Sequence, residues 1–193
     1  MKLLLLRCPR CNHALSPDQD DQVVQCPNCR AAVAINEAGV ELVNAHYAAP
    51  SGNPSHWLPF WVYLGQVTIR ERKTQGGRSA EQEAQAFWAR PRRLYIPAWG
   101  IDLRQARDMI SLLIQKQPSL EAIDPPAGTS FEPAVVTPAD GRKLLELVIV
   151  SIEAARKDWM ESLDYDLRLD SEALWLFPAT RKGNEWQLLL KKF

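Results

Sequence analysis

The sequence predicts an α+β protein with a small, metal-held unit of β-hairpins at its N-terminus and a larger α+β domain after it. First, all four cysteines fall within the first thirty of the 193 residues. Second, short apolar runs rich in aromatic and β-branched residues, typical of strands, later alternate with capped, amphipathic helix patterns. Third, the 14 prolines indicate bent strands and well-marked helix starts. We therefore expect the larger domain to contain proline-bent antiparallel strands and about three helices.

The cysteines form two Cys-Pro-x-Cys pairs, Cys8 with Cys11 and Cys26 with Cys29, and fourteen residues separate the pairs. Two residues between thiolates let one tight turn (a knuckle) present both sulfurs to a single metal ion, and two such knuckles complete a tetrahedron. The spacing therefore predicts one structural Zn²⁺ with four thiolate ligands. Because four thiolates leave no open coordination position, we do not expect the zinc to be catalytic.

Residues 1–36 resemble the N-terminal zinc ribbon of many bacterial and archaeal proteins, including ribbons associated with transcription factors and polymerases. Such knuckles often place glycine after the second cysteine, where this chain has Asn12 and Arg30. We expect a hairpin between the knuckles, a strand over 31–35 and another over 39–43. The ribbon would thus span 1–43. The following segment, 44–55, is rich in Pro, Gly, Ser and Asn, and we interpret it as a linker.

The first half of the 56–193 domain predicts two strand–helix pairs. We expect a strand over 57–70, a loop over 74–78, and a helix that Ser79 and Gln82 open as a capping box. A strand over 94–99 and a helix opened by Asp102 follow. Segments 58–61 and 96–99 share an apolar-Pro-x-Trp pattern, which suggests a duplicated β-loop-α unit over 57–117. Because proline lacks an N–H group, we expect both strands at a sheet edge or at a bulge.

The last third of the chain predicts a long helix and a β-meander. Thr137 is a suitable N-cap and Pro138 suits the first helical turn, so we expect a helix over 138–160. Three apolar runs, at 165–169, 173–177 and 186–190, then predict a three-stranded meander over 163–192.

The net charge of zero conceals an uneven distribution. Counting Lys and Arg against Asp and Glu gives −1 for residues 1–43, +4 for 44–100 and −3 for 101–193. The basic segment 70–93 either pairs with the acidic C-terminal half or forms a binding surface. Likewise, several of the seven tryptophans either pack a core corner or form a platform for a partner. The candidate partner surface comprises Trp57, Trp61, Trp99, Arg70, Arg72, Lys73, Arg90, Arg92 and Arg93.

No catalytic motif stands out: the sequence has no glycine-rich phosphate loop, nucleophile elbow or HExxH. We therefore expect a non-catalytic adaptor or accessory protein that binds a protein partner, with zinc in a purely structural role. The alternative is a nucleic-acid-binding accessory factor of transcription or translation that uses the ribbon and the 70–93 segment.

The whole chain, through the ribbon and segments 58–61, 95–99 and 139–147, resembles a group of uncharacterised bacterial zinc-ribbon proteins. Some members of that group act as accessory or adaptor proteins around membrane-associated assemblies, so the resemblance implies peripheral association with such an assembly. We expect no transmembrane segment, because the most apolar stretch, 144–152, contains Glu146 and is too short. We also expect a cytoplasmic protein, because there is no export signal and paired thiols of this kind suit a reducing compartment.

Overall fold

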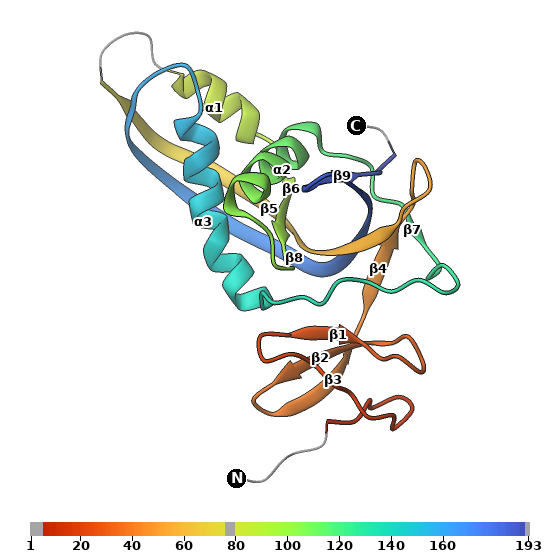
Figure 1. Ribbon diagram of the computed structural model, residues 1–193. Coiled ribbons are helices and arrows are strands. Elements are labelled where there is room, and N and C mark those ends of the chain that lie inside the picture. Colours follow the sequence, from red (N-terminus) through yellow and green to blue (C-terminus); the bar gives the residue numbers. More distant parts are fainter. Residues whose placement is uncertain (1–5, 76–79, 192–193) are drawn as a thin grey trace.

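The computed structural model describes residues 6–75 and 80–191 and confirms the α+β class. The small N-terminal sheet is antiparallel and contains, in the order β1-β2-β3, Val23–Gln25, Ala32–Asn36 and Gly39–Val43. The larger sheet has the order β6-β5-β8-β4-β7, with β9 paired to β8 (Figure 1). Its strands are β4 (Ala45–Ala48), β5 (His56–Thr74), β6 (Arg92–Pro97), β7 (Ala122–Ile123), β8 (Met160–Lys182) and β9 (Glu185–Leu188). Its helices are α1 (Glu81–Trp88), α2 (Leu103–Lys116) and α3 (Pro138–Ala154).

Two very long antiparallel strands, β5 with 19 residues and β8 with 23, pair with each other inside the larger sheet. The predicted meander is therefore wrong: segments 165–169 and 173–177 belong to the single strand β8, and only β9 is a separate strand. The polar stretch 170–172 does not break β8, because its partner β5 continues alongside it and a register shift at Leu64/Gly65 accommodates an extra residue. The strand–helix–strand–helix order of 57–117 is as expected, but β5 and β6 pair with each other and differ greatly in length.

Proline lies at an edge in β6 but not in β5. Pro97 belongs to the edge strand β6, as expected, whereas Pro59 lies in β5 between two neighbours. Ala98 N donates to Pro59 O at 2.9 Å, and the Ala98 carbonyl accepts from Val135 N and Val136 N instead of from an N–H group at position 59. Pro59 is therefore tolerated inside the sheet because another segment satisfies the acceptor opposite its missing N–H group.

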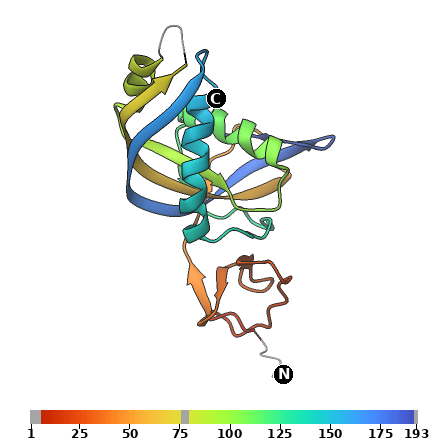
Figure 2. The same ribbon diagram turned by 90° about the vertical axis from the view of Figure 1, so that its left-hand side faces the viewer.

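Part of the expected linker, 44–55, belongs to the larger sheet. Strand β3 ends at Val43, and β4 begins at Ala45, parallel to β8 and antiparallel to β7. In Figure 2 the chain runs directly from the small sheet into the larger domain. The ribbon is also docked on the domain: Val23 and Ala134 exchange backbone hydrogen bonds of 3.1 and 2.8 Å, and Val23 lies in the main core cluster. The two units are therefore joined through Val23 and Ala32, which belong to the main core cluster, while Val24, Val33 and the cysteines form a second cluster within the ribbon.

The helix starts follow the predicted caps where the structure describes them. The Asp102 carboxylate accepts from two N–H groups of α2, and the Thr137 hydroxyl accepts from Asp140 N at the start of α3. The predicted capping box at Ser79, and the loop residues 76–78, lie outside the described residues. Helix α3 ends at Ala154, earlier than the predicted 160, because the chain after it turns back to bring Asp158 to α1 and β5.

Candidate metal centre

The four cysteines meet at one point of the ribbon, and their sulfurs all lie within 4.8 Å of one another. The Sγ atoms of Cys8 and Cys29 are 3.6 Å apart, as are those of Cys11 and Cys26. A tetrahedral site with Zn–S bonds of about 2.3 Å has S···S edges of about 3.8 Å, whereas a disulfide bond is only about 2.05 Å long. The predicted ligand set is thus together in a geometry that suits one tetrahedral metal ion.

The two knuckles have the same backbone hydrogen bonds. In the first, Cys8 N donates to His13 O and Asn12 N donates to Cys8 O, at 2.9 and 2.8 Å; the second repeats both bonds at the same spacing, at 2.9 and 3.0 Å. The residue after each second cysteine has a left-handed backbone, with φ of 59° at Asn12 and 63° at Arg30. Arginine is strained in this conformation. Here its side chain compensates, because Arg30 Nη1 donates to Thr129 O at 2.6 Å and thereby fastens the knuckle to the larger domain.

The electrostatics of the cluster also favour a cation. Hydrogen bonds from the Asn28 side chain and from the His13 N–H group lower the pKa of Cys11 to about 6. The Ala31 N–H group lowers the pKa of Cys29, but desolvation and the neighbouring thiols raise it to about 12 overall. Four adjacent thiols therefore cannot all lose their protons unless a positive charge lies between them. His13 is exposed and, within the described chain, is not part of the clustered ligand set.

Of the two alternatives for the tryptophans of the candidate partner surface, the platform is wrong for Trp57, Trp61 and Trp99. The exposed fractions of Trp57, Trp61 and Trp99 are 2%, 5% and 4%, so all three belong to the core. Trp57 packs edge-on against Tyr47, and Trp61 Nε1 donates to Val136 O at 2.7 Å. The interpretation that these side chains pack a core corner is the correct one. The 131–137 segment lies against all three positions, because it bonds to the Trp57 carbonyl, the Trp61 ring and the carbonyl of Ala98 beside Trp99.

Arg72, another candidate for the partner surface, is also buried. Its Nε donates to Glu153 Oε2 at 3.2 Å, and its Nη2 donates to Asp158 Oδ1 at 2.7 Å. Glu153 is completely buried and accepts further bonds from Trp88 Nε1 at 2.8 Å and Arg156 Nε at 2.6 Å. These five side chains, the Arg72 network, join β5, α1, α3 and the 155–159 turn, so Arg72 has a structural role.

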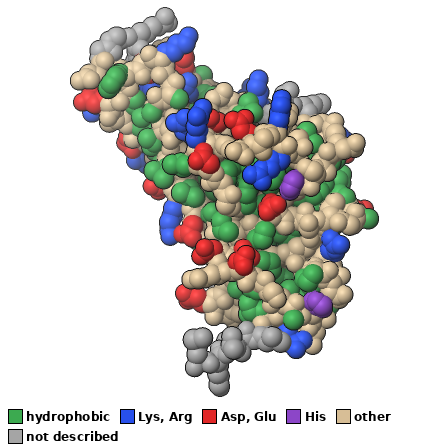
Figure 3. All heavy atoms as spheres, viewed as in Figure 1, with side chains coloured by type: hydrophobic (Ala, Val, Ile, Leu, Met, Phe, Trp, Pro, Cys, Tyr) green, Lys and Arg blue, Asp and Glu red, His purple; other side chains and the backbone are tan. Residues whose placement is uncertain are grey.

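Four of the five remaining basic candidates contact other parts of the protein. Arg70 forms a two-point ion pair with Asp166 of the acidic C-terminal half, with Nε 2.6 Å from Oδ2. Arg92 Nε donates to Phe87 O at 2.8 Å, and its guanidinium lies over the Phe87 ring. The other three are Lys73, paired with Glu71, Arg93, which donates to Pro118 O, and Arg90, which is exposed. Acidic and basic side chains are interspersed on the face of the molecule in Figure 3. Because Arg72 is buried and both Arg70 and Lys73 are paired with carboxylates, the 70–93 segment does not form one basic patch.

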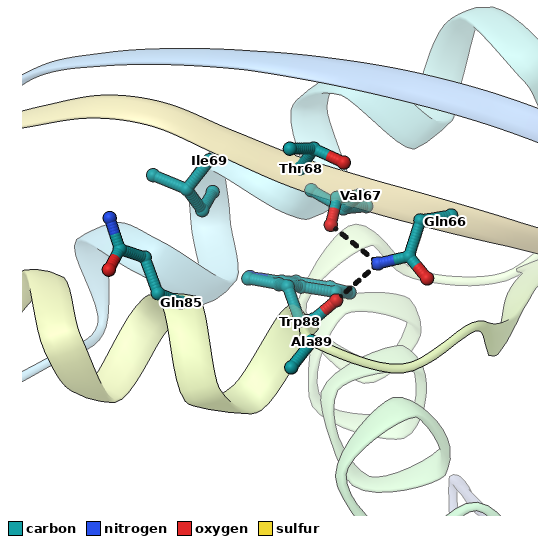
Figure 4. Close-up of a pocket in the computed structure, with 7 residues that line it drawn as sticks. All are labelled: Gln66, Val67, Thr68, Ile69, Gln85, Trp88 and Ala89. Carbon is teal, nitrogen blue, oxygen red and sulfur yellow. Dashed lines mark hydrogen bonds between the residues drawn. The ribbon is translucent and has the colours of Figure 1, made fainter.

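Two hollows of the described surface flank the larger sheet. One, of about 350 Å³, lies between α1 and residues 66–69 of β5. There Gln66 Nε2 donates to Val67 O at 2.9 Å and to Trp88 O at 2.5 Å, so its side chain bridges the strand and the helix (Figure 4). The second, of about 780 Å³, lies between α2 and the β8–β9 hairpin, and we call it the α2–β9 groove. The sequence did not single out this groove, because its walls come from segments some seventy residues apart.

Comparison with protein-family models, curated proteins and solved structures finds no match to the chain. The resemblance of the whole chain to bacterial accessory proteins therefore stays a prediction. None of the described helices is long and apolar enough to cross a membrane.

Proposed function

We propose that this chain is a non-catalytic zinc-ribbon protein that acts as an adaptor or accessory factor by binding a protein partner. The observation that carries the proposal is the closed set of four clustered cysteines, which offers a metal four protein ligands and leaves no position for a substrate. Zinc is the metal we assign, because a tetrahedral site of four thiolates suits Zn²⁺.

The position of the ribbon supports a structural role for the metal. Val23 and Ala32 of the small sheet are buried in the main core cluster, and Arg30 contacts the 124–137 connection through Thr129. So small a sheet cannot be stable through apolar burial alone, and metal binding supplies much of its folding free energy. The zinc would thus stabilise a surface on which the larger domain packs.

Two side chains outside the ribbon have strongly shifted pKa values, and their positions favour a binding function over catalysis. Hydrogen bonding to Arg72 lowers the pKa of Asp158 to about 2, and burial raises the pKa of Tyr95 to about 12. Neither residue lines the hollows described above, whereas enzymes place such groups in clefts. Large apolar side chains are exposed instead, with exposed fractions of 83% for Leu103, 65% for Leu147 and 73% for Trp159, and such residues favour contact with another protein.

The nucleic-acid alternative has less support. Arg72 is buried and Arg70 is paired, while Arg7 of the ribbon donates to Asn12 O at 2.9 Å. These contacts reduce the number of cations available to phosphates. Retardation of DNA or RNA by the full chain at low salt, lost as salt rises, would favour this alternative.

The proposed function is tested by metal analysis and by affinity capture of the full chain after crosslinking in native cells. We expect one zinc per chain and the reproducible enrichment of specific proteins over an unrelated zinc-ribbon bait. Leu103→Asp, Leu147→Asp and Trp159→Asp, all exposed and therefore expected to fold, should be compared with the wild type. Loss of an enriched protein in one folded variant supports the proposal; equal recovery by the unrelated bait contradicts it.

A further inference from the structure

We propose that the α2–β9 groove binds an extended, acidic segment of a partner protein, which adds as a strand to the free edge of β9. The inference rests on the proposed function and names the surface and the chemistry of the partner. Three independent features carry it: a free strand edge, an apolar floor beside that edge, and cations that lack ionic partners.

The groove follows the backbone edge of β9 rather than one face of the strand. All four β9 residues, 185–188, line it. Successive side chains of a strand point to opposite faces, so a hollow that touches four in a row must run along the edge between those faces. Within the described chain β9 pairs only with β8, so its other edge is free.

The register identifies the backbone groups that face the groove. Leu189 N donates to Pro178 O at 2.7 Å, and β8 and β9 pair antiparallel from there to the hairpin turn. Hydrogen-bonded and non-hydrogen-bonded pairs alternate in such a ladder, so Trp186 and Leu188 direct their N–H and C=O groups away from β8. An extended peptide can bond to both residues, as in recognition by β-strand addition.

At two other places where a strand edge without a partner strand lies beside a helix, a glutamine side chain bonds to the backbone of that edge. On β6, the Gln117 amide donates to Arg93 O and accepts from Arg93 N, both at 2.9 Å. On β5, Gln66 covers Val67 O. An open edge promotes unwanted pairing, and proteins normally block it. The β9 edge instead faces a hollow large enough for a peptide.

The floor of the groove is apolar and well supported. Met109 and Leu112 from α2 line the groove together with Trp186 and Leu188 from β9, and the exposed fraction of Leu112 is 44%. Gln105 Nε2 donates to Asn184 O at 3.0 Å and holds the helix to the hairpin turn. Alternate apolar side chains of an added strand would pack between the helix and the strand.

The charges favour an acidic occupant. Arg104, Lys116 and Lys182 line the groove, and none of them forms an ion pair with a described residue. A further cation, Arg181, lies over the Trp186 ring at 5.3 Å.

The acidic residues of the groove are partly neutralised. Asp102 accepts from the first N–H groups of α2, and Asp108 lies 3.5 Å from Arg107 Nε. Only Glu185, beside the hairpin turn, lacks such a contact in the described structure. The lining thus holds three carboxylates beside its three cations, and Arg107 and Arg181 add two cations next to it. Cations of the groove and its rim therefore outnumber the carboxylates five to three, which complements carboxylates on the partner.

The test uses three blocked decapeptides and the ¹⁵N-labelled, zinc-loaded full chain in NMR titrations. The first peptide alternates valine and threonine between pairs of glutamates, the second has lysines in place of the glutamates, and the third is the first with a central proline. We expect the first to shift the Trp186 and Leu188 amides and to bind at least about tenfold more tightly than either of the others. No shift at these amides up to millimolar peptide, or equal binding of the lysine peptide, overturns the proposal.

Variants locate the site. Leu112→Asp places a negative charge on the floor of the groove and should weaken binding at least about tenfold, whereas Leu42→Asp, on β3 of the small sheet and 50% exposed, should leave it unchanged. The reverse result would assign the peptide to the small sheet and overturn the groove proposal. If Leu112→Asp still captures the native partner, the groove proposal fails while the proposed function stands. If the wild type captures no partner but binds the acidic peptide, the proposed function fails and the groove stands.

Discussion

Replacing Arg72 by methionine should strongly destabilise the protein, and the same change at Arg70, two residues earlier on β5, provides a matched control. The Arg72 side chain is completely buried and donates hydrogen bonds to Glu153 and Asp158. The side chains of the Arg70–Asp166 pair, by contrast, are 57% and 56% exposed. Removing one partner of a buried ion pair leaves an uncompensated charge and costs about 3–5 kcal/mol, whereas an exposed pair is screened by solvent and contributes little to stability.

The expected loss for Arg72→Met lies at the lower end of that range. Glu153 keeps its bonds from Trp88 and Arg156, and Asp158 keeps the bond from Ala80 N, so both carboxylates stay partly compensated. A loss of about 3 kcal/mol corresponds to a Tm lower by about 6–12 °C for a chain of this size. Urea unfolding of both variants measures the difference. Equal free energies of unfolding for Arg72→Met and Arg70→Met would refute the reasoning.

The same contact predicts an acid dependence. Hydrogen bonding to Arg72 lowers the pKa of Asp158 from 3.8 to about 2 in the folded protein. A lowered folded pKa contributes stability above the unfolded value, and this contribution is lost as the pH falls from about 4 to about 2. In Arg72→Met the free energy of unfolding should therefore fall less steeply over this window than in the wild type. Identical slopes would show that Asp158 does not depend on Arg72.

Three further predictions concern packing, strain and the metal. Gly141→Ala should destabilise the protein by about 1–3 kcal/mol despite the better helix propensity of alanine, because its Cβ would collide with the Tyr63 hydroxyl. Adding Tyr63→Phe to this variant should recover part of the loss, and denaturant midpoints without such recovery would contradict this account. Arg30→Ala should be about 1 kcal/mol less stable than Arg30→Gly, because both lose the bond to Thr129 but only alanine is strained at a φ of 63°, and equal midpoints would argue against the strain. Chelation of the metal should reduce hydrogen-exchange protection in the ribbon and also in the 131–136 segment, because Val23 is part of the main core; loss confined to the ribbon would show that the two units are independent.

The prolines show how the sheet departs from the sequence expectation. Pro178 in β8 repeats the arrangement at Pro59. Leu189 N donates to the Pro178 carbonyl, and because Pro178 has no N–H group to donate in return, Ser51 N donates to the Leu189 carbonyl instead. In both cases a distant segment replaces the missing donor. The rule that proline belongs at an edge failed for Pro59 because it considers only the strand itself.

The elements that could be predicted depend on neighbours in the sequence. The knuckles around Cys8 and Cys26, the left-handed residues Asn12 and Arg30, and the α2 and α3 starts at Asp102 and Thr137 each need only a few consecutive residues. Hydrogen bonds within such short spans form wherever the pattern occurs, because little chain entropy opposes them.

Tertiary structure alone decided the features that depend on partners far along the chain. Segment 44–55 has the composition of a linker, but part of it pairs with β8 as strand β4. Strand β8 stays continuous through its polar centre because β5 pairs with it on both sides of that stretch. Burial of Trp57, Trp61 and Trp99 likewise depends on segments up to 75 residues away that cover them. The sequence by itself therefore determined the two cysteine knuckles and the starts of α2 and α3, because local geometry is sufficient for both. The assembled sheet decided which aromatic and basic side chains reach the surface, because burial depends on what packs above a residue rather than on the residue type.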